Sequence, residues 1–200
     1  MTTAFNTRFV PIMALMLAFP AVLPAVETYN IDSAHSEATF RIRHLAFTKV
    51  SGKVPLQGTI RMDESDQRKS SVDVVIDAAS LNTGNETRDK DLRSAKFFDV
   101  ATYPNITFKS SAVTEVSKGK LSVTGTLTMH GKAKTVVIPV EFKGTAPGAK
   151  PGTTVAGFEG NLTLDRTDYG IKTYASDSGD VGMVGKEVTL NLIIEADKVP

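Results

Sequence analysis

One run of ten residues in the middle of the chain indicates the fold class. It reads Lys120-Leu121-Ser122-Val123-Thr124-Gly125-Thr126-Leu127-Thr128-Met129. Apolar side chains or glycine stand at the odd positions, and polar side chains stand at the even ones. A period of two is expected of a β-strand, because successive side chains point to opposite faces of the sheet. The run therefore predicts a strand with one buried and one solvated face.

Seven further runs with the same alternation lie on either side of it, so the pattern occurs eight times in all. Their apolar faces include Phe40 and Ile42, Val54 and Ile60, Val74 and Ile76, Ile106 and Phe108, Ile138 and Val140, Phe158 and Leu162, and Leu190 and Leu192. Segments rich in Gly, Asp, Asn and Ser separate most of the runs, including residues 63–71 and 117–119. Such segments suit hairpins between antiparallel neighbours, so a meander is the simplest topology.

Eight antiparallel strands with one apolar face each can stack as a sandwich or curl into a closed barrel. Both arrangements satisfy the pattern. The barrel is favoured because closure removes exposed strand edges, and eight strands enclose a space that side chains fill or that holds one small ligand. The predicted fold is all-β, an eight-stranded antiparallel barrel whose apolar faces point inward.

One segment departs from the period of two. Thr83-Gly84-Asn85-Glu86 has the spacing of a capping box, with Thr83 as the N-cap, and predicts a short helix from about residue 85 to residue 94. Two pairs in it, Glu86 with Lys90 and Asp89 with Arg93, have helical i,i+4 spacing. So short a helix is marginal alone, and we expect it to rest on the barrel and to be able to swing aside.

The N-terminus has the layout of a secretory signal peptide. Arg8 is its only charged residue before an apolar run that extends from Phe9 to Val26. A membrane anchor is the alternative, but the prolines within the run, Pro11, Pro20 and Pro24, disfavour a spanning helix. We expect cleavage after Ala25, which leaves one domain at residues 26–200, no stable membrane anchor, and a periplasmic or secreted location.

Composition excludes several classes of function. The chain has no cysteine, so it forms no disulfide and no thiolate site. Its net charge is only +1, and removing Arg8 with the leader leaves none, so neither nucleic acid nor an anionic membrane surface is favoured as a partner. The three histidines, His35, His44 and His130, show no metal-binding spacing, and no phosphate-binding glycine loop is present. We therefore expect no metal, no nucleotide and no other cofactor.

Two short polar motifs remain as candidate sites. Asp32 and His35 stand just before the first long strand, where a polar group at a barrel mouth would lie, and can be read as an acid–base pair. A hydrolase triad is disfavoured because no nucleophile elbow is present. Arg88 and Asp89 lie in the predicted helix, and a guanidinium suits a phosphate or carboxylate as well as an ordinary surface ion pair.

Taken in order, these segments resemble the YceI-like family of extracytoplasmic proteins. The resemblance covers nearly all of residues 28–198. It is carried by Tyr29-x-Ile31-Asp32-x-x-His35-Ser36, Asn82-Thr83-Gly84, Arg88-Asp89, Phe97-Phe98-Asp99, Tyr103-Pro104, Gly125-x-Leu127-Thr128-x-His130-Gly131 and Asp165-Arg166-Thr167-Asp168-Tyr169-Gly170-Ile171. One departure is Asp91, at a position where relatives often have histidine.

The resemblance implies a lipocalin-like barrel that binds a polyisoprenoid, such as a polyprenyl phosphate or a quinone-like lipid, for transport or storage. Its implied head-group residues, at the mouth of a tunnel, are Asp32, His35, Arg88 and Asp89. The apolar tunnel would be lined by Phe40, Ile42, Val74, Ile76, Phe108, Leu121, Val123, Leu127, Ile138, Val140, Leu190 and Leu192. Burying a CH₂ group yields about 0.8 kcal/mol, so a tail of about 15 to 20 carbons offsets association costs of about 4 to 15 kcal/mol.

A binding protein without catalytic activity is the leading hypothesis. An enzyme that acts on an isoprenoid lipid through Asp32 and His35 is one alternative, and a ligand-free structural or stress-related barrel is another. The oligomeric state stays open, with a homodimer as one option. Ligand length, head group and physiological role are likewise not indicated by the sequence.

Overall fold

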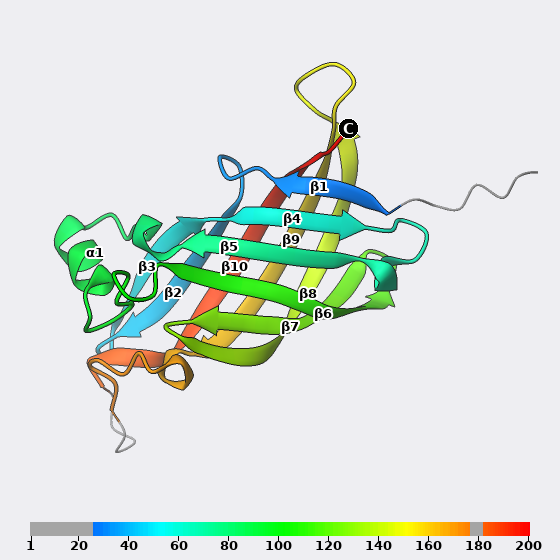
Figure 1. The fold of residues 1–200 in the computed structure, drawn as a ribbon. Coiled ribbons are helices and arrows are strands. Elements are labelled where there is room, and N and C mark those ends of the chain that lie inside the picture. The colour runs from blue at the N-terminus through cyan, green and yellow to red at the C-terminus, as the bar shows by residue number, and fades with distance from the viewer. Residues whose placement is uncertain (1–25, 177–181) are drawn as a thin grey trace, which may run out of the picture.

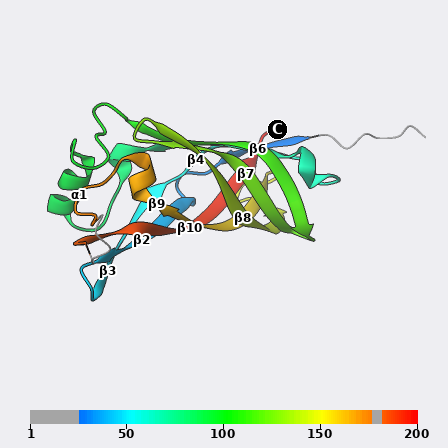
Figure 2. The same ribbon diagram turned by 90° about the horizontal axis from the view of Figure 1, so that it is seen from below.

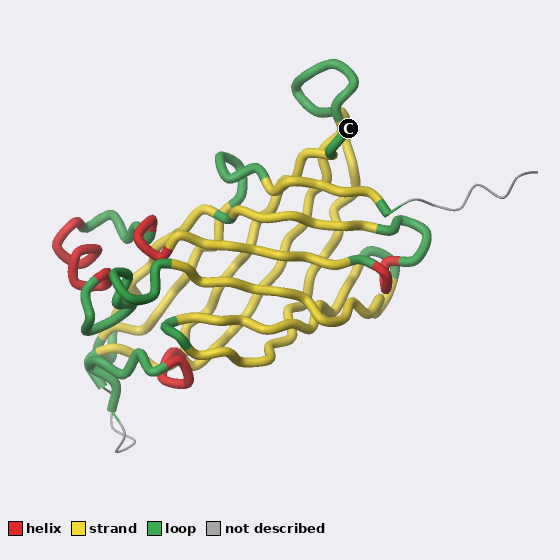
Figure 3. The backbone as a smooth tube through the Cα atoms, viewed as in Figure 1, coloured by secondary structure: helices red, strands yellow, loops and turns green. Residues whose placement is uncertain are grey.

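The computed structural model describes residues 26–176 and 182–200, so the predicted signal peptide at residues 1–25 lies outside the described residues. Strands dominate the fold (Figures 1 and 3). They are β1 (Glu27–Ile31), β2 (Glu37–His44), β3 (Thr48–Pro55), β4 (Gln57–Met62), β5 (Ser71–Asp77), β6 (Asn105–Ser117), β7 (Lys120–Met129), β8 (Lys132–Pro147), β9 (Thr154–Asp165) and β10 (Val184–Lys198). The helical elements are α1 (Glu86–Arg93) and the 3-10 turns η1 (Gln67–Lys69), η2 (Ala78–Ser80) and η3 (Arg166–Tyr169).

The strands close into an antiparallel barrel, as predicted (Figure 2). From β4 to β10 each strand pairs with the next along the chain, and β1 pairs with both β4 and β10. Strand β2 continues beside β10 where β1 stops, because Leu190 pairs with Phe40 and Lys198 pairs with Tyr29. In the same way β3 and β4 are two parts of one strand, interrupted at Leu56. Ten strand segments therefore occupy eight positions around a lipocalin-like barrel.

The predicted register is confirmed. The inward face of β7 carries the buried Leu121 and Val123, whereas Thr124 is only partly buried and Thr126 is exposed. Other predicted inward residues that are buried are Val74, Phe108 and Ile138, and those partly buried against the same core are Phe40, Ile76, Leu127, Val140, Leu190 and Leu192. The remaining one, Ile42, is half-buried near the end of β2 and is not part of this core. A slip of one residue would exchange the faces, so the apolar pattern specifies which residues of each strand face the core.

Two glycines give aromatic rings room inside the barrel. A Cβ atom on Gly52 would lie 2.4 Å from the ring of Phe40, its cross-strand partner. A Cβ atom on Gly125 would lie 2.5 Å from the ring of Phe108. Both contacts are far closer than van der Waals distance, so the rings lie flat over positions that only glycine can occupy.

Helix α1 forms where it is predicted, but its N-cap is not the predicted residue. Asn85 is the N-cap, and its side chain accepts a hydrogen bond of 3.0 Å from the backbone N–H of Arg88. The capping-box assignment to Thr83 was wrong, because the Thr83 hydroxyl donates to the Asp89 carboxylate instead. The guanidinium of Arg93 donates to two main-chain carbonyls near η2, at 2.7 and 2.8 Å, and so ties the helix to one end of the barrel (Figure 1).

Candidate functional site

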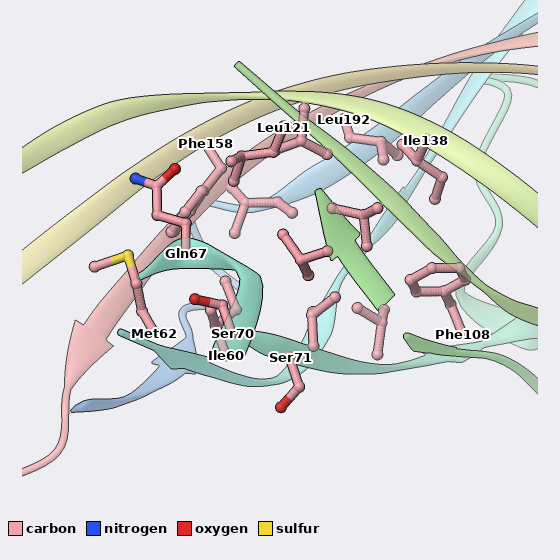
Figure 4. A pocket seen from close by; sticks show the side chains of 16 residues that line it. Ile60, Met62, Gln67, Ser70, Ser71, Phe108, Leu121, Ile138, Phe158 and Leu192 are labelled. Atoms are coloured by element: carbon pink, nitrogen blue, oxygen red, sulfur yellow. The ribbon is translucent and has the colours of Figure 1, made fainter. Parts of the chain in front are cut away.

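The barrel encloses an apolar cavity of about 90 Å³ (Figure 4). It is lined by Ile60, Met62, Gln67, Ser70, Ser71, Val72, Val74, Phe108, Val113, Leu121, Val123, Ile138, Val140, Phe158, Leu192 and Ile194. None of these side chains carries a charge. The cavity is large enough to hold water, yet smaller than the roughly 300–1,000 Å³ typical of sites for drug-sized ligands. A long tail therefore requires lining side chains to turn aside as it enters.

The lining includes only part of the predicted tunnel. Seven predicted residues line the cavity, namely Val74, Phe108, Leu121, Val123, Ile138, Val140 and Leu192. The other five, Phe40, Ile42, Ile76, Leu127 and Leu190, are not among its lining residues. Except for Ile42, these five pack against the same apolar core.

One end of the cavity is formed by the connection between β4 and β5, which includes η1. Asp63 organises this connection, and only 2% of its surface is exposed. Its carboxylate accepts from the Ser65 hydroxyl at 2.6 Å and from the N–H groups of Ser65 and Asp66, each at 2.9 Å. These hydrogen bonds, first among them that from the Ser65 hydroxyl, hold the pKa of Asp63 below its usual value. The sequence predicted a plain hairpin connection here and gave no signal that it would face the cavity.

Asp32 and His35 lie on the outer wall, in the connection between β1 and β2. The His35 Nδ1 atom is 2.6 Å from the Asp32 carboxylate, and the His35 side chain is 68% exposed. His35 borders an outer groove of about 460 Å³, whose lining also includes Lys53 and Asn82. Three side-chain atoms, one each from Asp32, His35 and Glu195, lie within 4.8 Å of one another. These three atoms could act as ligands of a metal ion. Glu195 was not among the predicted site residues, since no local motif connects it to Asp32.

The pairing of Asp32 with His35 has a measurable consequence. The Asp32 carboxylate raises the pKa of His35, and the same hydrogen bond lowers the pKa of Asp32. The ion pair stabilises the folded state fully between about pH 4 and pH 6.5. These limits are the pKa values of the Asp and His side chains in the unfolded chain. The stabilisation fades as pH rises through the raised pKa of His35, and as pH falls through the lowered pKa of Asp32.

We therefore expect the Asp32→Asn substitution to lower the pKa of His35 toward about 6.5. NMR titration of the imidazole protons measures this pKa. The matched control is Asp73→Asn, which removes an exposed carboxylate on β5 and should leave the His35 titration curve in place. An unchanged His35 curve in the Asp32→Asn variant would contradict the assigned ion pair.

Arg88 and Asp89 form a separate group at the start of α1, around Thr83. The Arg88 guanidinium donates to the Thr83 hydroxyl at 2.7 Å and to the Thr83 carbonyl at 3.0 Å. Asp89 is 6% exposed, and its carboxylate accepts from the N–H and the hydroxyl of Thr83. Across the described residues, no hydrogen bond or ion pair joins Arg88 or Asp89 to Asp32 or His35, so the expectation that the four residues gather at one mouth stays a prediction. None of them lines the cavity, and their role in ligand binding stays a prediction.

A closed eight-stranded antiparallel barrel with an apolar cavity defines a lipocalin-like protein. Within this class the chain belongs to the YceI-like family, since the model of the YceI-like domain matches residues 29–196. A curated relative, a UPF0312 protein of Vibrio parahaemolyticus, is 37% identical over 170 residues, which are 83% of this chain and 88% of the relative.

Solved structures with the same fold include BcnA of Burkholderia cenocepacia, with a TM-score of 0.69, 26% identity, and coverage of 82% of this chain and 98% of BcnA. The YceI protein of Campylobacter jejuni has a TM-score of 0.67 and 31% identity, and the match covers 79% of this chain and 90% of that one. A polyisoprenoid binding domain from Saccharophagus degradans has a TM-score of 0.63 at 17% identity, with 86% and 98% coverage, and shows likeness of fold alone. Across residues 26–176 and 182–200, no helix has both the length and the apolar composition to cross a bilayer.

Proposed function

We propose that this protein binds a single isoprenoid lipid with its tail inside the barrel, and that it carries or stores the lipid outside the cytoplasm. The observation that supports this most directly is the cavity in the barrel interior, whose lining is apolar apart from Gln67, Ser70 and Ser71. A hydrocarbon tail gains free energy from burial against such side chains at about 0.8 kcal/mol per CH₂. The Saccharophagus degradans protein with the same fold is a polyisoprenoid binding domain, which supports this proposal.

The proposed activity is binding without chemistry and without a cofactor. No residue of the cavity lining is a usual general acid or base at neutral pH, and the lining includes no carboxylate or histidine. The acid–base pair of the enzyme hypothesis, Asp32 with His35, is not part of the cavity lining. An extracytoplasmic location accords with the apolar run at residues 9–26, which has the layout of a signal peptide.

The ligand-free structural barrel remains a second candidate, and the small volume of the cavity, about 90 Å³, favours it. The two candidates differ in what the purified protein contains. Native mass spectrometry of the chain, expressed with its own N-terminal segment, should show a bound species that organic extraction removes. The mass of that species should fit an isoprenoid series.

The same preparation, stripped by extraction and refolded, should then take up geranylgeraniol added from a small volume of ethanol. A bare-chain mass before extraction, together with no uptake afterwards, would contradict the lipid-binding proposal and support the structural barrel. The denatured chain serves as the control for covalent additions, because a non-covalent lipid does not survive denaturation.

A further inference from the structure

Gln67 is the one polar side chain at the cavity with an unmet hydrogen-bonding requirement among the described residues. It belongs to η1, is half-buried, and projects among the side chains that line the cavity (Figure 4). Its amide oxygen is buried and has no hydrogen-bond partner in the described part of the chain. Buried polar atoms are satisfied in the large majority of cases, so an exception calls for an explanation such as a missing ligand.

The neighbouring polar groups do not meet this requirement. The Ser70 hydroxyl accepts a hydrogen bond from the backbone N–H of Asp63 at 3.1 Å, which ties it to the turn. The cations next to Gln67 point away from the cavity. Arg68 lies 2.7 Å and Lys69 lies 3.8 Å from the Asp66 carboxylate, and both cationic side chains are mostly exposed.

The cavity therefore offers a neutral polar end with one unmet acceptor, the Gln67 amide oxygen. An anionic phosphate would have to lose its water there without any charged side chain in the lining to replace it. A quinone has only acceptor oxygens, so it leaves a carbonyl acceptor unsatisfied. A hydroxyl group is neutral and donates one hydrogen bond, which is what the Gln67 oxygen lacks.

We propose that Gln67 binds the hydroxyl head group of an isoprenoid alcohol, which donates a hydrogen bond to the Gln67 amide oxygen. The inference rests on the proposed lipid-binding function and names its ligand class. A small turn of the amide about its last side-chain torsion, which is broad in energy, brings the oxygen to the ligand. The alcohol lies with its hydroxyl at the η1 end of the barrel, and its tail runs toward α1 at the other end (Figures 1 and 3).

This orientation separates the head group from Arg88 and Asp89, which lie in α1. It places the tail where Phe108, Val74 and Ile138 line the cavity. Beyond them the core contains Phe40, Ile76 and Leu190, which the tail must displace as it extends.

Two ligands that differ by one hydrogen-bond donor test the proposal. Geranylgeraniol donates from its hydroxyl, whereas geranylgeranyl methyl ether keeps the oxygen and loses the donor. Isothermal titration of the wild-type protein should show the alcohol binding roughly tenfold more tightly than the ether, the effect of one buried hydrogen bond. In Gln67→Met, a change that nearly conserves side-chain volume, this ratio should fall to about one, mainly through weaker binding of the alcohol.

The chain supplies its own control, because Gln57 and Gln67 are its only glutamines and Gln57 is exposed. The Gln57→Met variant should keep the wild-type ratio, and circular dichroism checks that each variant is folded. Equal wild-type affinities for the two ligands, or a ratio that survives Gln67→Met, would overturn the assignment while leaving the lipid-binding proposal intact. Loss of the ratio in Arg88→Met but not in Gln67→Met would place the head group at α1 and also overturn it. Failure of the wild-type protein to bind either ligand would instead refute the lipid-binding proposal itself.

Discussion

Replacing Arg166 with leucine is expected to lower the free energy of unfolding by about 3–5 kcal/mol, the cost of breaking a buried charged network. Arg166 is 5% exposed, although it carries a charge at neutral pH. Its guanidinium donates to four main-chain carbonyls: Gly185 and Ile171 at 2.7 Å each, Thr173 at 2.9 Å and Val184 at 3.1 Å. One side chain thus joins η3 and the segment after it to the start of β10.

The physical reason for so large an effect is the number of acceptors that lose their donor. Each buried carbonyl left without a partner costs about 1–3 kcal/mol, and leucine cannot donate to any of them. Lysine at this position keeps the charge but lacks the planar guanidinium group with its several donors. Arg166→Lys should therefore recover only a small part of the lost free energy of unfolding.

Urea unfolding followed by far-ultraviolet circular dichroism measures this effect. The matched control is Arg41→Leu, on the exposed outer face of β2, which should change the free energy of unfolding by no more than about 0.5 kcal/mol. A loss below about 1 kcal/mol for Arg166→Leu would mean that water replaces the guanidinium at these carbonyls.

Filling the cavity is expected to weaken lipid binding about 100-fold or more without breaking the barrel. Val123 lies on β7, faces the cavity and pairs with Ile138 on β8. A tryptophan at position 123 would occupy space that the isoprenoid tail needs. Excluding about four carbons from burial costs about 3 kcal/mol, which corresponds to a loss of affinity of roughly 100-fold or more.

The control for Val123→Trp is Val137→Trp, which places the same ring on the exposed, outward side of β8. The chain has no tryptophan, so each variant carries a single fluorophore whose emission reports whether the ring is buried. Overpacking costs about 1–3 kcal/mol, so thermal unfolding must first show that Val123→Trp is folded. Equal lipid affinity of the two folded variants would show that the lipid does not occupy the cavity.

The strands and their faces could be predicted from the sequence because the pleat of a strand is local. The alternation in residues 120–129 specifies which side chains point inward, whatever the partner strands are. The position of α1 could be predicted as well, because helix-start signals are also local in the sequence. Strand β1 was missed because only Tyr29 and Ile31 mark its buried face, and two residues are too few to show a period.

The candidate site could be predicted only in part. The apolar lining follows from the alternation, so Val74, Val123 and Ile138 were expected to face inward and do so. The position of Gln67 was not predicted, since nothing in Asp66-Gln67-Arg68 indicates which way a 3-10 turn will face. The prediction that Asp32 and Arg88 lie at one mouth likewise rests on the placement of two loops, which no local pattern specifies.

What the sequence determined by itself is a set of antiparallel strands with one apolar face each, because a period of two and turn residues between the runs act over a few neighbouring residues. A sandwich and a barrel both satisfy that pattern, and the tertiary structure selects the barrel. The contacts between residues far apart in the chain form only when the barrel closes. Closure places Glu195 beside Asp32, brings the carbonyls of Val184 and Gly185 to Arg166, and puts Gln67 among the residues that line the cavity. Such contacts depend on where strands far apart in the chain come together, and their energies arise only once the barrel has closed.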